Sequence, residues 1–168
     1  MGAPPSPASV PAAPAISAPL RFTTAERDFA VQVVSKGLYE IEVSRLAAVR
    51  AMNASVRAYA QSMAAHHTQL NSELVALMDA RGVVPPHNLP DDKAAKLQRL
   101  ASLPSSEAFD LAYIRVVGVE DHQEVIAAFE KARGEVRDPE LRAWMERTLP
   151  MLRGHLSQAQ TIAGQLAG

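Results

Sequence analysis

Histidine and carboxylate side chains at helical spacing are the groups in this sequence that are equipped for chemistry. His67, His122 and His155 each lie on the apolar stripe of a predicted helix, and Glu42 lies on the stripe of a fourth. Neutral imidazoles and a carboxylate together suit zinc, copper or another borderline divalent ion in a four-coordinate site. The sequence therefore predicts one inward-facing metal ligand on each of four helices.

The chemistry of the available ligands narrows the choice of metal. The chain of 168 residues has no cysteine, which excludes disulfides, thiolate zinc sites, iron–sulfur clusters and cysteine nucleophiles. A di-iron centre is disfavoured because no Glu-x-x-His motif recurs on two helices. A ligating imidazole also needs a partner for its second nitrogen, and Asn71 and either Asp121 or Glu120 are available for this. We therefore expect zinc or copper.

The overall composition is that of a helical and nearly neutral chain. Apolar residues make up 48% and aromatic residues 5%, which favours helices over a β-sandwich. The 17 basic and 18 acidic residues give a net charge of -1, so nucleic acid and anionic membranes are not expected partners. No segment approaches the roughly 20 apolar residues that span a bilayer, so membrane insertion is not expected. A metal ion is the expected partner, and a protein partner or homo-oligomer is left open.

The first 21 residues differ from everything that follows. They contain six of the 12 prolines and no charge before Arg21. Proline at this density prevents helices and sheet ladders and favours an extended linker. The segment lacks the basic start and uninterrupted apolar run of a secretory signal peptide. We predict a disordered Pro/Ala-rich linker over residues 1–21 and a four-helix bundle domain over residues 22–168.

Capping and stop signals divide this domain into four long helices. Thr23 and Glu26 fit a capping box, Gly82 ends the second helix, and Asp138-Pro139 opens the last one. The predicted helices run from Thr23 to about Met52, from Asn53 or Ser55 to about Arg81, from Ser105 or Ser106 to near Gly134, and from Asp138 onward.

The connections between these helices are unequal in length. Tight turns near residues 53–54 and 134–138 make two antiparallel hairpins. Between the hairpins lies a long segment, residues 82–104, in which Asp91–Leu103 is predicted to form a short helix. Two helical hairpins joined by one long crossover are the arrangement of a ferritin-like four-helix bundle. The predicted fold class is therefore all-α.

The four candidate ligands fall at similar depths along this bundle. Glu42 and His67 both lie about 17–20 Å from the first turn at 1.5 Å per residue. His122 and His155 differ by about 6 Å relative to the second turn, a mismatch that a bend at Pro150 can absorb. The predicted buried stripe of the first helix comprises Val31, Leu38, Glu42, Leu46 and Val49. These registers allow the four side chains to converge.

Two other interpretations of the same residues stay open. Buried histidines often form hydrogen-bonded polar layers, and Glu42 has Arg45 one turn away, where the two can form an ion pair. In that case the protein is a metal-free structural or stress-related partner-binding bundle. An enzymatic role, with a histidine as general base or a metal-bound water as nucleophile, requires an open cavity that reaches the cluster.

Five sequence motifs stand out along the predicted helices, namely Gly37–Ala47 (GLYEIEVSRLA), Met63–Asn71 (MAAHHTQLN), Val119–Glu130 (VEDHQEVIAAFE), Asp138–Leu141 (DPEL) and Leu149–Leu156 (LPMLRGHL). They resemble those of a family of exported bacterial proteins. The resemblance covers roughly residues 25–163 and is to a ferritin-like four-helix family catalogued as a domain of unknown function, number 4142. It implies the ferritin-like fold, no established reaction, and a periplasmic or secreted location, because members usually carry signal peptides.

The resemblance also implies a set of polar site positions, which fall on Glu40, Glu42, His67, Asn71, Asp121, His122 and His155. Glu40 does not fit the predicted buried stripe, so either it faces a different neighbour or the stripe is too narrow. His66 replaces the acidic residue that the family commonly has before the histidine. Either a supporting carboxylate is missing here or His66 adds a ligand. Further candidate ligands are therefore Glu40, His66 and Asp121.

Overall fold

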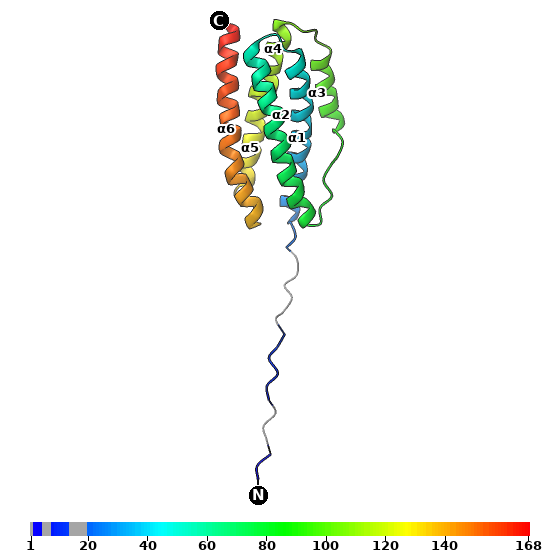
Figure 1. Ribbon diagram of the computed structural model, residues 1–168, viewed down its shortest axis with the longest axis vertical. Helices are drawn as coiled ribbons and strands as arrows, with labels where there is room; N and C mark the ends of the chain where they lie inside the picture. The colour runs from blue at the N-terminus through cyan, green and yellow to red at the C-terminus, as the bar shows by residue number, and fades with distance from the viewer. Residues whose placement is uncertain (1, 5–7, 14–19) are drawn as a thin grey trace.

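The computed structural model describes residues 2–4, 8–13 and 20–168, and all regular structure in these residues is helical. Long helices lie side by side and form a bundle (Figure 1). The predicted all-α fold class is confirmed. In chain order the elements are α1 (Thr24–Arg50), α2 (Ala54–Ala80), α3 (Asp91–Ala101), α4 (Glu107–Tyr113), η1 (Ile114–Glu120), α5 (Asp121–Ala132) and α6 (Pro139–Ala167).

The bundle consists of two antiparallel hairpins. α1 packs against α2, and η1 and α5, which continue from α4, pack against α6. Contacts between α2 and α6 and between α1 and α5 close the ring of helices. The chain crosses from one hairpin to the other through residues 81–106, and α3 in this crossover packs on α1 (Figure 1). This is the ferritin-like order of helices that the unequal connections predicted.

The helix ends follow the predicted signals. Thr23 and Glu26 form a complete capping box at α1, Asn53 caps α2, and Asp138 caps α6. Gly82 has a φ of 71°, the left-handed conformation that commonly follows the end of a helix. These ends fix the height of every interior side chain along the bundle.

The third long helix is not a regular α-helix along its whole length. Ile114–Glu120 forms a π-helical segment, η1, which was not predicted. The Asp121 amide donates to the Val116 carbonyl five residues earlier, so the wider turn changes the face that α5 presents to the interior. A Cβ added at Gly118 would lie 2.7 Å from the Cβ of Ala159. The glycine therefore lets η1 pack directly on α6.

The interior has two apolar cores separated by a polar layer. One core lies between the beginning of α1 and the end of α2 and includes Phe29 and Leu74. The other lies near the turn between α1 and α2 and includes Tyr59 and Ile162. Between the cores, each long helix buries a polar side chain, namely Glu40 on α1, His67 on α2, His122 on α5 and His155 on α6.

The predicted linker over residues 1–21 falls partly outside the described residues, which omit 1, 5–7 and 14–19. Its described residues are exposed and have no helix or strand. Phe22 packs against the apolar core. Within the described ranges, none of the helices combines the length and the apolar character needed to cross a membrane.

Candidate metal site

Three histidines from three helices meet in the polar layer. His67 on α2, His122 on α5 and His155 on α6 each offer a ring nitrogen, and these nitrogens lie within 4.8 Å of one another. The ring centroids are 5.4 Å to 5.6 Å apart. All three side chains are buried. The structure thus brings together three of the four side chains that the sequence placed inward.

Each of these imidazoles has a buried nitrogen without a hydrogen-bond partner in the described part of the chain. Nε2 of His67, Nε2 of His122 and Nδ1 of His155 are buried and have no hydrogen-bond partner among the described residues. A buried polar atom without a partner is costly and uncommon in folded proteins. The triad could hold a metal ion, which would pair with all three nitrogens at once.

The π-helical segment fixes the orientation of His122. Its Nδ1 donates a hydrogen bond of 2.9 Å to the carbonyl of Val117 in η1. With the proton on Nδ1, the lone pair is on Nε2, which is the unpaired atom. A backbone carbonyl is a usual partner for the outer nitrogen of a metal-binding histidine. The sequence predicted that a side chain would pair with the outer nitrogen of this histidine. In the structure a backbone carbonyl of the π-helical segment does so instead.

His66 contacts His155 from the solvent side. The His66 side chain is exposed, and its ring stacks on that of His155 with 5.1 Å between centroids and 10° between planes. Nδ1 of His66 lies 2.9 Å from Nε2 of His155, so one of the two nitrogens carries the shared proton. When His155 donates it, Nδ1 of His155 keeps a lone pair for a metal. His66 thus lies at the rim of the triad and orients one of its members.

Burial keeps the three rings in the neutral form that binds metals. Burial lowers the pKa of His67 well below its ordinary value, and the nearby His122 and His155 lower it further. Burial lowers the pKa of His155 to about 3. For His122, burial lowers the pKa and outweighs the opposing effects of the Val117 carbonyl and the Asp121 carboxylate. The triad is therefore uncharged at pH 7 when no metal is bound.

The prediction that Glu42 faces the interior is wrong. Its side chain is 53% exposed and pairs with Arg45 at 3.4 Å, which is the ion pair considered as an alternative. The acid that α1 buries in the polar layer is Glu40. The predicted stripe is rotated away from the true buried face, and its last member, Val49, is 88% exposed. A competing stripe at three- and four-residue spacing was the available signal, namely Phe29, Ala30, Val33, Gly37, Glu40, Ser44 and Ala47.

The polar neighbours expected to support the histidines make other contacts. Nδ2 of Asn71 donates to the Val34 carbonyl at 3.1 Å, and Asp121 pairs with Lys96. Asp121 and Glu40 instead line a small cavity that His67 also borders. The volume of this cavity is about 30 Å³, which is enough for one water molecule.

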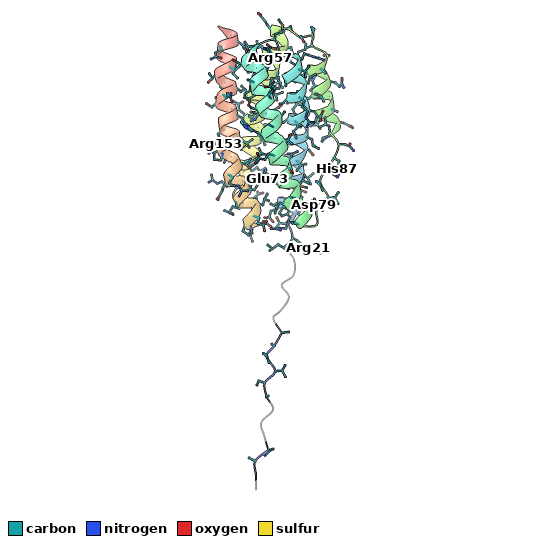
Figure 2. The ribbon with its side chains drawn as sticks, in the orientation of Figure 1. Arg21, Arg57, Glu73, Asp79, His87 and Arg153 are labelled. Carbon is teal, nitrogen blue, oxygen red and sulfur yellow. The ribbon has the colours of Figure 1, made fainter. Side chains whose placement is uncertain are left out.

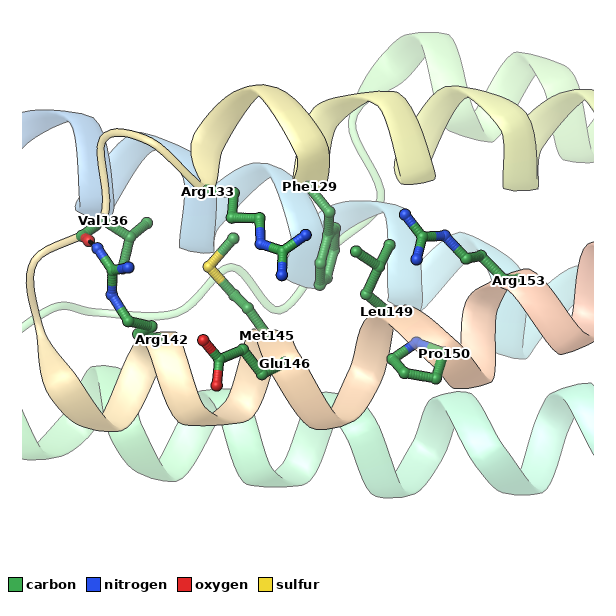
Figure 3. A pocket seen from close by; sticks show the side chains of 9 residues that line it. All are labelled: Phe129, Arg133, Val136, Arg142, Met145, Glu146, Leu149, Pro150 and Arg153. Carbon is green, nitrogen blue, oxygen red and sulfur yellow. Dashed lines mark hydrogen bonds between the residues drawn. The ribbon is translucent and has the colours of Figure 1, made fainter.

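A larger pocket between α5 and α6 lies apart from these residues. Its volume is about 90 Å³, and it is lined by apolar side chains, three arginines and Glu146. Figure 3 shows Arg133 and Arg153 on either side of Phe129 and Leu149. The candidate ligands are not part of its lining, so this opening does not lead to the triad.

Fold and interior together define the class of this protein: a four-helix bundle with a buried histidine triad that could hold a metal ion. The model of a family described as a domain of unknown function, DUF4142, matches residues 11–162. The chain therefore belongs to the DUF4142 family, as its motifs indicated.

Comparison with solved structures supports the fold. The crystal structure of a DUF305 fragment from Deinococcus radiodurans is similar, with a TM-score of 0.76 and 17% sequence identity. The similarity covers 87% of this chain and 99% of that chain. No curated protein sequence matches the chain. At this level of identity the structural similarity concerns the fold alone.

Proposed function

We propose that this protein binds a transition metal ion in its interior through His67, His122 and His155. The observation that carries the proposal is the convergence of three buried imidazoles, which offer ring nitrogens within 4.8 Å of one another and each of which has a buried nitrogen without a partner among the described residues. When each of these nitrogens keeps its lone pair, the three need three donors, and one water molecule donates at most two hydrogen bonds. A metal ion pairs with all three, so the unpaired nitrogens favour a metal over a water-filled polar layer.

Zinc and copper suit this set of ligands best. Zinc–nitrogen bonds of about 2.0–2.1 Å place tetrahedral nitrogen ligands roughly 3.4 Å apart. The nitrogens here lie within 4.8 Å of one another, so modest rotations of the rings would complete the site. A fourth position would remain open to water or another ligand. A di-iron centre is less suited, because it takes inward carboxylates from all four helices.

The proposed role is metal binding, with no reaction assigned to it. We place this role in the periplasm or outside the cell, because members of the family usually carry signal peptides. The competing function is a metal-free structural or stress-related bundle that binds a protein partner, with the same side chains serving as a polar layer.

Metal content and thermal melting test the proposal together. Protein purified without chelator should contain about one zinc or copper ion per chain. Stripped protein should melt several degrees higher once metal is restored, because a ligand at 100 times its Kd adds about 2.7 kcal/mol to the free energy of unfolding.

Two histidine variants provide the control. His67→Ala should lose both the bound metal and the shift in melting temperature. His87→Ala should keep both, since His87 is exposed on the crossover, away from the interior (Figure 2). The competing structural function would be supported if the wild-type protein bound no metal and if His67→Ala were equally destabilised with and without added metal.

A further inference from the structure

A second group of unpaired polar atoms lies beside the histidine triad. The Tyr39 hydroxyl, Oε2 of Glu40 and Oδ2 of Asp121 are buried and have no hydrogen-bond partner in the described part of the chain. These residues are 1%, 5% and 8% exposed, respectively. All three line the cavity of about 30 Å³ that His67 also borders. The three residues that carry these oxygens therefore line a space the size of one water molecule or one ion.

The crossover helix α3 covers these oxygens with positive charge. Lys96 pairs with Oδ1 of Asp121. The Nζ atoms of Lys93 and Lys96 lie 5.6 Å and 5.5 Å from the centre of the Tyr39 ring, and Lys93 lines the same cavity. Elements from three parts of the sequence, α1, α3 and α5, thus meet at one point.

The lysines of α3 do not pair with every carboxyl oxygen of Glu40 and Asp121. Lys96 contacts one oxygen of Asp121, while the other oxygen is among the unpaired atoms of the described residues. Burial raises the pKa of Glu40 well above its ordinary value, and the Asp121 carboxylate raises it further, against the lowering effect of Lys96 and Lys93. The Lys96 side chain is 24% exposed, so its ammonium group can move into solvent without crossing the core.

We propose that Glu40, Asp121 and Tyr39 form a second cation site, which takes a hard divalent cation such as Mn²⁺, Mg²⁺ or Ca²⁺. Carboxylate and hydroxyl oxygens are the ligands that these ions prefer. Binding displaces the Lys96 ammonium group outward into solvent and, where Glu40 carries a proton, releases that proton to solvent. The site goes beyond the zinc or copper site because none of its ligands is an imidazole. It also gives α3 a role, since α3 supplies the charge that the cation replaces.

Manganese binding tests this site, because EPR spectroscopy counts the Mn²⁺ ions that remain free in solution. The wild-type chain, titrated with and without zinc, should bind about one Mn²⁺. Glu40→Gln and Asp121→Asn should each weaken this binding at least about tenfold, because each removes a charged ligand. Lys96→Met should tighten it roughly tenfold, because an ammonium group no longer competes for Asp121. This gain cannot arise from a misfolded variant.

Glu130→Gln is the matched control, because it removes an exposed acid of α5 whose partner is Arg153. It should leave Mn²⁺ binding unchanged. Absence of Mn²⁺ binding in both the wild type and Lys96→Met overturns the proposal, as does full binding in Glu40→Gln. Loss of Mn²⁺ binding with zinc binding intact counts against this site alone. Failure to bind zinc with Mn²⁺ binding intact counts against the histidine site alone.

Discussion

Two groups of buried polar residues in this bundle differ in how completely they are paired. At the end where α1 begins, Arg81 donates to Asp138 at 2.6 Å, and Asp138 also caps the first turn of α6. Glu26 beside them accepts hydrogen bonds from three backbone amides. This cluster ties α1, α2 and α6 together and orients their ends.

The polar layer in the middle of the bundle is the opposite case. Its members each keep a buried atom that has no partner within the described residues, and they are Tyr39, Glu40, His67, Asp121, His122 and His155. Both groups are polar and buried, so burial does not tell them apart. A fully paired cluster stabilises the fold, whereas an unpaired one carries a cost that a bound ion would remove. The contrast is therefore one between a structural and a binding region.

The largest expected effect concerns the paired cluster. Arg81→Met leaves the buried Asp138 carboxylate without its cation, which should lower the free energy of unfolding by roughly 3–5 kcal/mol. Urea unfolding followed by circular dichroism measures this loss. Arg45→Met, which removes an exposed ion pair, should cost less than about 1 kcal/mol. An equally small loss for Arg81→Met would remove the distinction between the two regions.

Acid should destabilise the two regions in separate pH ranges. The pKa values of the triad histidines are lowered in the folded chain but are about 6.5 when unfolded. Below pH 6.5 the unfolded chain therefore takes up protons that the folded chain does not. The free energy of unfolding should fall by up to about 1.4 kcal/mol per pH unit for each histidine.

The paired cluster should respond only in stronger acid. Burial tends to raise the pKa values of Glu26 and Asp138, but hydrogen bonds from backbone amides and from Arg81 outweigh it and lower both. Their contribution to the free energy of unfolding is fully present above their pKa values in the unfolded chain, which are near 4, and is lost as the pH falls through their lower pKa values in the folded chain.

Unfolding curves of wild type and His67→Leu between pH 7 and 3 test this separation of the two pH ranges. In the variant, the free energy of unfolding should fall less steeply with decreasing pH between pH 6.5 and 4.5. Below pH 4 it should fall as it does in the wild type. Glu40, whose raised pKa acts in the opposite direction, is present in both proteins.

A smaller effect is expected when the unpaired layer is made apolar. His67 forms no side-chain hydrogen bond with the described residues, so His67→Leu in metal-free protein should change the free energy of unfolding by less than about 1 kcal/mol, in either direction. Zinc should no longer raise its melting temperature. A loss as large as that of Arg81→Met without metal would make the histidine layer structural.

The smallest effect is expected at Glu42. Its carboxylate is exposed and pairs with Arg45, so Glu42→Gln should alter stability by less than about 0.5 kcal/mol and leave zinc affinity unchanged. Isothermal titration with zinc measures the affinity. A clear loss of affinity would restore Glu42 to the set of ligands and contradict its position in the structure.

The fold was largely predictable because its signals are local. Caps such as Asn53 and Asp138 fix where helices start, and a turn at Gly82 fixes where one ends. The apolar residues of α2 and α6 form a single stripe each, so the inward positions of His67 and His155 follow from helical spacing alone. The unequal lengths of the connections then determine which helices form hairpins and where the crossover lies.

The rest of the interior was not predictable, for three physical reasons. α1 carries apolar residues on two competing faces, so the choice between Glu40 and Glu42 depends on the packing of its neighbours. The segment IRVVGVE carries no local signal for the π-helical turn that orients His122. The pairing of Lys96 with Asp121 joins a crossover helix to the bundle, and no periodic pattern relates the two. The identity of the metal ligands stays a prediction.

Anomalous diffraction at the zinc absorption edge, from crystals grown with zinc, tests the central claim most directly. The account predicts a peak in the polar layer, bonded at about 2.0–2.1 Å to Nε2 of His67, Nε2 of His122 and Nδ1 of His155. A triad without a peak, with ordered water bonded to these nitrogens and zinc bound only at surface residues, would contradict it.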